Sequence, residues 1–102
     1  MTFIMVTCRV PPHNIDGLGQ AFLAKKVPEV ADFVKRVNIW VVADYETKTY
    51  ALYEVPKEKM WEGYISIATR YAGYRIVEGF TYKIEALATI QEALPMIGLG
   101  KK

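Results

Sequence analysis

The sequence predicts an α+β domain whose elements follow the order β-α-β-β-α-β around a four-stranded antiparallel sheet. Its length of 102 residues is that of one domain. Four segments are rich in β-forming residues, and two others carry apolar residues at helical spacing. Prolines at positions 11, 12, 28, 56 and 95 separate these segments. We therefore interpret residues 1–102 as a single domain, with residues 85–102 as a C-terminal extension.

The first half of the chain begins with a strand over residues 2–10. Alternation divides this strand into two mostly apolar faces, one with Ile4, Val6, Cys8 and Val10 and the other with Phe3, Met5, Thr7 and Arg9. Two apolar faces indicate a central strand, and Pro11-Pro12 ends it. Asn14 can cap a helix whose apolar stripe is Ile15, Leu18, Phe22 and Leu23. Beyond Pro28, a short helix is expected over residues 29–34.

The second half predicts a hairpin, a longer helix, a strand and a tail. The hairpin is expected from a strand over 36–45, a polar turn over 46–48 and a strand over 49–55. Pro56 can open a helix over 57–72, and Gly73 is a natural C-cap. The last elements are a strand over 75–84 and a tail helix over 85–96, whose apolar stripe predicts packing on the sheet, the helices or a partner subunit.

This element order is the split-βαβ, ferredoxin-like arrangement, in which helices cover only one face of the sheet. The other face is expected to present Phe3, Met5, Trp40 and Val42 among a few polar groups. A bare apolar face of that size indicates a partner-binding surface. The simplest partner is a second copy of the chain, because closed twofold dimers dominate among oligomers. Two sheets meeting face to face form a dimeric α+β barrel, so we expect a homodimer or a higher homo-oligomer.

Composition excludes several classes of function. Thirteen basic and eleven acidic residues give a net charge of +2, which argues against strong nonspecific binding to nucleic acid. No apolar run approaches the length of about 20 residues that a membrane span needs. The N-terminus lacks the basic region of a signal peptide, and Cys8 is the only cysteine. We therefore expect a cytoplasmic protein, and the scarcity of Asn and Gln is compatible with a thermophile.

RNA-recognition domains share the same element order and need a separate test. Their third strand carries a basic residue, a glycine and then alternating aromatic residues. Lys48, Tyr50 and Ala51 match that pattern. Thr49 stands where the glycine is required, and Leu52 replaces a stacking aromatic residue. The sequence therefore disfavours RNA binding.

Four short motifs point to a family. They are residues 3–7 (Phe-Ile-Met-Val-Thr), residues 11–14 (Pro-Pro-His-Asn), residues 40–44 (Trp-Val-Val-Ala-Asp) and residues 50–54 (Tyr-Ala-Leu-Tyr-Glu). Over residues 3–84 the chain resembles a family of short dimeric α+β barrel proteins known as a domain of unknown function. His13 and Val41 depart from that family's usual acidic residue and frequent histidine. The resemblance implies a dimeric barrel, in a superfamily that includes cofactor-free monooxygenases, haem-degrading enzymes, lactone isomerases, polyketide cyclases and ligand-binding regulatory domains.

The candidate catalytic residues are Asp44 and His13. A carboxylate near the indole of Trp40 in a dry cleft would have a raised pKa and could act as a general acid or base. His13 is the natural single base because histidine titrates near neutrality. The alternative for Asp44 is a turn residue at the hairpin. The alternative for His13 is a solvated loop residue.

The candidate ligand-binding residues are Arg9, Asn38, Trp40 and Tyr71. Strand alternation puts the first three on the sheet face away from the helices, and Tyr71 reaches them only if the second helix overhangs that face. Arg9 could hold an anionic substrate or pair with Glu54 or Asp44. Tyr71, Tyr74 and Arg70 form a cluster that suits a polar aromatic substrate, or that simply packs as tyrosines with hydrated hydroxyls.

Two hypotheses of function follow. In the first, the dimer binds a small aromatic or carbonyl-containing molecule in a cleft on the sheet and performs acid–base chemistry without a cofactor. In the second, it is a noncatalytic module for oligomerisation or ligand sensing. A polar-lined cavity of several hundred Å³ favours the first, and a barrel filled by its own side chains favours the second. With one cysteine and one histidine, we expect no metal site.

Overall fold

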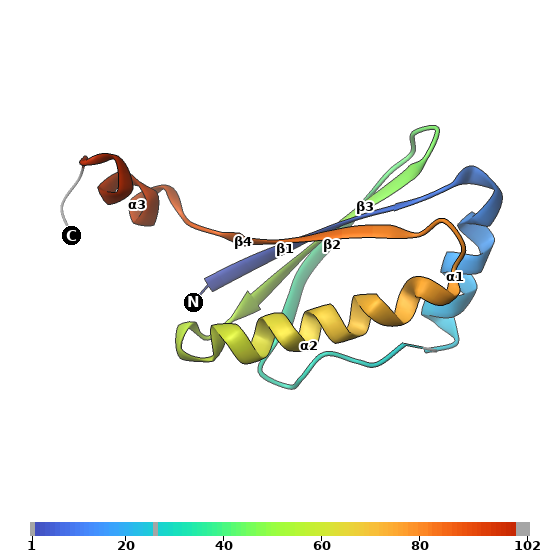
Figure 1. Cartoon of the computed structure of the whole chain (residues 1–102), viewed down its shortest axis with the longest axis horizontal. Coiled ribbons are helices and arrows are strands. Elements are labelled where there is room, and N and C mark those ends of the chain that lie inside the picture. Colours follow the sequence, from blue (N-terminus) through green and yellow to red (C-terminus); the bar gives the residue numbers. More distant parts are fainter. Residues whose placement is uncertain (1, 26, 100–102) are drawn as a thin grey trace.

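The computed structural model describes residues 2–25 and 27–99, and it has the predicted α+β architecture (Figure 1). The strands are β1 (Thr2–Val10), β2 (Lys35–Val42), β3 (Thr47–Val55) and β4 (Thr81–Leu87). The helices are α1 (Ile15–Leu23), α2 (Met60–Ala72) and α3 (Ile90–Ala93). Short 3-10 helices are η1 (Pro12–Asn14), η2 (Lys57–Lys59), η3 (Gly73–Ile76) and η4 (Leu94–Ile97). No helix in this described part of the chain is long and apolar enough to cross a membrane.

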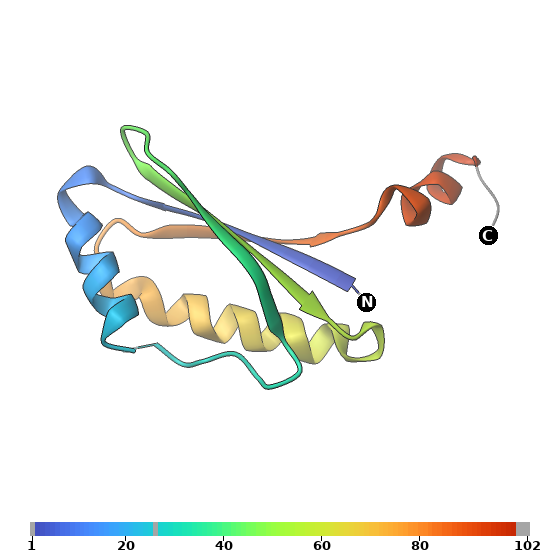
Figure 2. The same cartoon turned by 180° about the vertical axis from the view of Figure 1, so that it is seen from behind.

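The four strands form one antiparallel sheet in the order β2-β3-β1-β4. The central pair is in register along its whole length, from Thr2 opposite Val55 to Val10 opposite Thr47. Both α1 and α2 lie on the same side of the sheet (Figures 1 and 2). This topology is the ferredoxin-like fold that the sequence predicts.

The core lies between α2 and the two central strands. Its most completely buried large side chains are Tyr53, Ile4, Ile67, Val6, Val10 and Val55. The strand members of this set are even-numbered in β1 and odd-numbered in β3, because alternate side chains point to opposite faces of a sheet. The prediction that the face of β1 with Ile4, Val6, Cys8 and Val10 packs on the helices is confirmed.

The predicted helix over residues 29–34 is wrong. Residues 28–31 have no regular secondary structure, and a hydrogen bond from the Val34 N–H to the Ala31 carbonyl (3.0 Å) closes a single turn over residues 31–34. The segment runs beside α2 (Figure 2). Its backbone is bonded to α2 side chains instead: the Ala31 N–H donates to Ser66 Oγ (2.8 Å), and Arg70 Nη1 donates to the carbonyl of Pro28 (3.0 Å). Val34 is buried in the core. One hydrogen-bonded turn and the contacts with α2 therefore take the place of a helix here.

The bounds of the hairpin and of the last strand also differ from the sequence prediction. The hairpin strands end at Val42 and restart at Thr47, so Asp44 lies in the loop rather than in a strand. Residues 73–76 continue α2 as η3, and a turn at Gly79, with φ of 81°, precedes β4. The last strand consequently begins at Thr81 and not at Arg75, and it continues to Leu87 where a tail helix was expected.

Residues 88–99 form a C-terminal arm that extends beyond the sheet, away from α1 and α2 (Figures 1 and 2). A capping box joins Thr89 and Glu92, so α3 has a well-defined start. The apolar side chains of Ile90, Met96, Ile97 and Leu99 are exposed. The radius of gyration is 15.4 Å, whereas a compact chain of this length has about 13 Å. The arm therefore does not pack on its own sheet or helices, and packing on a partner stays a prediction.

Gly63 allows α2 to approach β3 closely. A Cβ atom at this position would lie 2.5 Å from Val55 Cγ1, whereas a Cβ at Gly19 in α1 would meet nothing within 4 Å. We expect Gly63→Ala to lower the free energy of unfolding by about 1–3 kcal/mol through overpacking. Gly19→Ala should raise it by about 0.5–1 kcal/mol, because alanine favours the helix. Urea denaturation measures both variants, and equal effects would contradict the close approach.

Candidate functional site

Three predicted ligand-binding residues lie on the sheet face turned away from α1 and α2, which we call the open face. Trp40 lies opposite Tyr50, Asn38 opposite Leu52, and Arg9 opposite Lys48. All three are exposed, and Trp40 retains 45% of its accessible surface. The structure thus brings them to one surface, as predicted, although that surface is not enclosed within a single chain.

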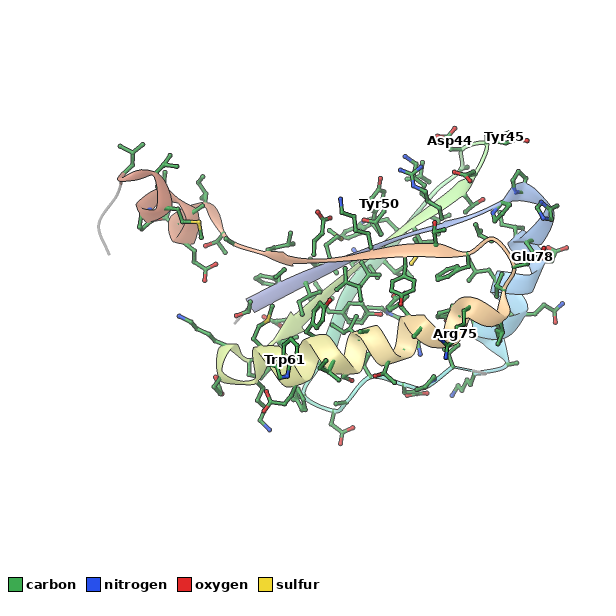
Figure 3. The ribbon with its side chains drawn as sticks, viewed as in Figure 1. Asp44, Tyr45, Tyr50, Trp61, Arg75 and Glu78 are labelled. Carbon is green, nitrogen blue, oxygen red and sulfur yellow. The ribbon has the colours of Figure 1, made fainter. Side chains whose placement is uncertain are left out.

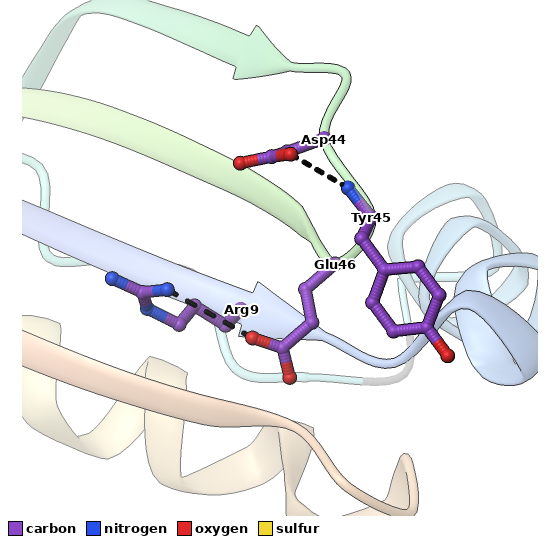
Figure 4. Close-up of polar contacts among 4 residues, drawn as sticks. All are labelled: Arg9, Asp44, Tyr45 and Glu46. Carbon is purple, nitrogen blue, oxygen red and sulfur yellow. Dashed lines mark hydrogen bonds and ion pairs between the residues drawn. The ribbon is translucent and has the colours of Figure 1, made fainter.

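Polar contacts at the hairpin occupy Arg9 and Asp44 (Figure 4). Asp44 Oδ1 accepts a hydrogen bond from the Tyr45 N–H (2.8 Å), which is the geometry of a turn residue. Arg9 Nη1 lies 3.8 Å from Glu46 Oε1, so its ion-pair partner is neither Glu54 nor Asp44. Both side chains of this pair are about half exposed, and such pairs contribute about 0–1 kcal/mol. Asp44 thus lies in the hairpin loop, as its structural alternative predicts, whereas Arg9 pairs with Glu46, a partner that the sequence did not predict.

His13 and Tyr71 lie apart from the open-face residues. His13 is exposed in η1, after the end of β1. Tyr71 is buried on α2 and faces the core, where its hydroxyl lies 2.8 Å from the hydroxyl of Tyr53. The sheet therefore separates Tyr71 from Arg9, Asn38 and Trp40. Figure 3 shows the same division: Asp44 and Tyr45 lie at the hairpin tip, and Tyr50 lies on the side of the sheet away from α2.

Tyr71 belongs to a different site, a cavity of about 450 Å³ on the helix side of the sheet. We call this space the helix-side cavity. Its walls come from α1, the C-terminal end of α2 with η3, and strands β1, β2 and β3. Its lining is mainly apolar and includes Cys8, Leu18, Phe22, Ile39, Val41, Thr49, Arg36, Arg70, Tyr71, Tyr74 and Phe80.

The cavity exists because the helices cover the sheet incompletely. α1 has only nine residues, Ile15–Leu23. Ile39 and Val41 consequently remain 40% and 66% exposed, although they point to the helix side of the sheet. A bulge between Arg36 and Asn38 sets this orientation, because an extra residue in a strand shifts the alternation.

Cys8 and Tyr71 are two titratable groups in the lining of the cavity. Burial raises the pKa of the Cys8 thiol to about 11, although a hydrogen bond with Thr49 opposes the shift. Burial also raises the pKa of Tyr71, and the neighbouring Tyr53 hydroxyl adds to the effect. Both groups are therefore protonated at neutral pH. They can exchange hydrogen bonds with a ligand, but they are poor general bases.

Sequence analysis found part of this site and missed the rest. It grouped Tyr71 with Tyr74 and Arg70, and Arg70 Nη2 does donate to the Tyr74 hydroxyl (3.3 Å). It missed Phe22, Arg36 and Thr49. The available signal was Cys8 and Thr49, two small polar residues that pair across the helix-side face of the central strands. Among the residues that the structure describes, no group of three His, Cys, Asp or Glu side chains could hold a metal.

The raised pKa of Cys8 predicts slow reaction with thiol reagents. At pH 8 the folded chain should carry about one hundredfold less thiolate than a thiol with the ordinary pKa of 9.0. We expect the labelling rate of the folded protein to rise tenfold per pH unit from pH 8 to about 10. The urea-unfolded chain should level off near pH 9. Coincident pH profiles for the folded and the unfolded chain would contradict the burial of Cys8. The Cys8→Ala variant is the control for labelling that does not involve the thiol.

The raised pKa of Cys8 also predicts how the stability of the fold changes with pH. Because the pKa is higher in the folded state, the unfolded chain loses the thiol proton first, and folding stability should fall as pH rises from about 9 to about 11.

No family model, curated protein or solved structure matches this chain. What the protein binds therefore has to be argued from its own two surfaces. These are the helix-side cavity and the open face.

Proposed function

We propose that the protein binds a small molecule with an aromatic ring or a carbonyl group in the helix-side cavity. The observation that carries this proposal is the cavity itself, whose volume of about 450 Å³ lies within the range of small-molecule sites. Phe22, Tyr74 and Phe80 offer aromatic surface. Thr49 and Tyr71 offer hydroxyl groups that can donate to a carbonyl oxygen.

The protonation states of the side chains that line the cavity favour ligand binding over acid–base catalysis. Cys8 and Tyr71 carry protons at neutral pH. The two predicted catalytic residues, Asp44 and His13, do not line the cavity. A ligand-binding or sensing role therefore fits this geometry best, and Asp44 and His13 have no catalytic role in it.

A substitution that fills the helix-side cavity should abolish the binding of a small apolar ligand. We expect N-phenyl-1-naphthylamine, a neutral dye that fluoresces in apolar surroundings, to bind once per chain. Thr49→Phe places a ring in the cavity and should remove the signal. Thr69→Phe makes the same change on the exposed side of α2 and should leave it intact. Fluorescence titration measures both, with circular dichroism to check folding.

Two results would overturn the proposal. One is the absence of any dye signal with the original chain. The other is a folded Thr49→Phe variant that binds the dye as well as the original chain does.

A specific observation favours a second candidate function, self-assembly through the open face. The centre of this face is apolar and includes Phe3, Met5, Trp40, Tyr50 and Leu52, according to the pairing register. Charged residues surround that centre at both ends and along β4: Arg9, Lys35, Lys48, Glu54, Lys83 and Glu85. An apolar centre with a charged rim is the usual anatomy of a protein–protein interface.

A second copy of the chain suits this face. A dimer is the assembly implied by the resemblance to dimeric α+β barrel proteins, and a twofold axis lets one patch cover its own copy. The exposed apolar side chains of the C-terminal arm offer further surface to the same partner. The two candidate functions are compatible because they use opposite faces of the sheet.

The two tryptophans give a matched test of assembly. Trp40→Asp places an unpaired charge in the apolar part of the open face, on the edge strand β2, and should dissociate the dimer or unfold the chain. Trp61→Asp makes the same change at the exposed start of α2, where Trp61 is 69% exposed, and should leave the dimer intact. Sedimentation measures both. A stable 11.6 kDa monomer of the original chain at micromolar concentration would refute self-assembly.

A further inference from the structure

A second hollow of about 420 Å³ adjoins the helix-side cavity. The two spaces share Phe22, Arg36 and Arg70 in their linings. Its lining is more polar than that of the cavity, and its described residues include three positive side chains, Lys25, Arg36 and Arg70, and one carboxylate, Glu29. We call it the cationic hollow.

We propose that the cavity and the cationic hollow form one site for an amphipathic organic anion. The apolar body of the ligand lies in the helix-side cavity, and its carboxylate lies beside Arg36 and Arg70. This inference rests on the proposed function and names the class of ligand: aromatic or acyl carboxylates.

Arg36 is held at the boundary of the two spaces by β2 and α1. It lies opposite Tyr53 in the sheet, directly before the bulge. Its guanidinium carbon lies 5.8 Å from the centre of the Phe22 ring, a cation–π contact. Within residues 2–25 and 27–99, no carboxylate forms an ion pair with Arg36. Its charge is thus positioned without being neutralised.

Arg70 is fixed more firmly by neutral partners. Nη1 donates to the carbonyl of Pro28 (3.0 Å), and Nη2 donates to the Tyr74 hydroxyl (3.3 Å). These bonds set the plane of the guanidinium, and its other N–H groups remain available to a ligand. In the described part of the chain Arg70 also has no ion pair. A planar guanidinium held in one orientation can donate two parallel hydrogen bonds to a carboxylate, and its unpaired positive charge attracts that group.

The charges and the apolar walls together select the ligand. Among the residues that the structure describes, the lining of the cationic hollow has three positive groups and one negative group, and an anion bound there reduces the repulsion between the guanidinium groups. The adjoining cavity exposes mostly apolar wall, which a small inorganic ion cannot cover. An anion with an apolar body satisfies both halves of the site, whereas a neutral aromatic molecule satisfies only one.

The test compares two probes of the same shape, 2-naphthoate and 2-naphthamide, as competitors of N-phenyl-1-naphthylamine. We expect 2-naphthoate to bind at least about tenfold more tightly, because a hydrogen bond to a charged group is stronger than a neutral one. Arg36→Met and Arg70→Met should each reduce this preference severalfold. Arg75→Met, an exposed arginine in η3 outside both spaces, should preserve it. Added salt should weaken the binding of 2-naphthoate and leave the binding of 2-naphthamide unchanged.

Two outcomes would overturn the inference while leaving the proposed function in place. One is equal competition by both probes in the original chain, with the dye still bound and still excluded by Thr49→Phe. The other is the same loss of preference in Arg75→Met as in Arg36→Met. Should Arg70→Met unfold because it loses its bond to Pro28, Arg36→Met decides the question. Loss of dye binding to the original chain would instead refute the proposed function.

Discussion

The close seating of α2 on the central strands is the contact on which the rest of the structure depends. Gly63 leaves room for Val55, so the start of α2 lies directly against the end of β3. Further along the helix, Ile67 is fully buried and Tyr71 bonds to Tyr53. Because the helix is fixed at both places, it covers the part of β1 and β3 that carries Ile4, Val55 and Tyr53, and Cys8 and Thr49 border the open space beyond it.

The helix-side cavity follows from this placement. α1 is too short to cover β2, so the space beside Ile39 and Val41 stays open. The bonds from Arg70 to Pro28 and from Ala31 to Ser66 hold the connecting segment against α2 rather than in the gap. The cavity is thus a product of element lengths, of the bulge in β2 and of polar anchors on α2.

Local patterns were sufficient to predict the sheet and the faces of its central strands. Alternation in β1 and β3 is regular, and Pro56 marks the start of the second helical region. The segment 29–34 was not predictable because its backbone bonds to side chains more than thirty residues away. Tyr71 lies on the other side of the sheet from Arg9, Asn38 and Trp40 for a related reason. Which side of the sheet Tyr71 faces depends on how α2 rotates against β3, and helical spacing alone does not fix that rotation.

Alternation along β3 brings the two proposed surfaces onto one strand. Thr49 lines the helix-side cavity, while its neighbour Tyr50 points to the open face. Tyr53 likewise borders the cationic hollow, and Leu52 beside it belongs to the open face. A ligand on one side and a partner on the other would therefore contact adjacent residues of the same central strand. Because β3 is hydrogen-bonded to both β1 and β2, neither contact can displace it without straining the paired strands.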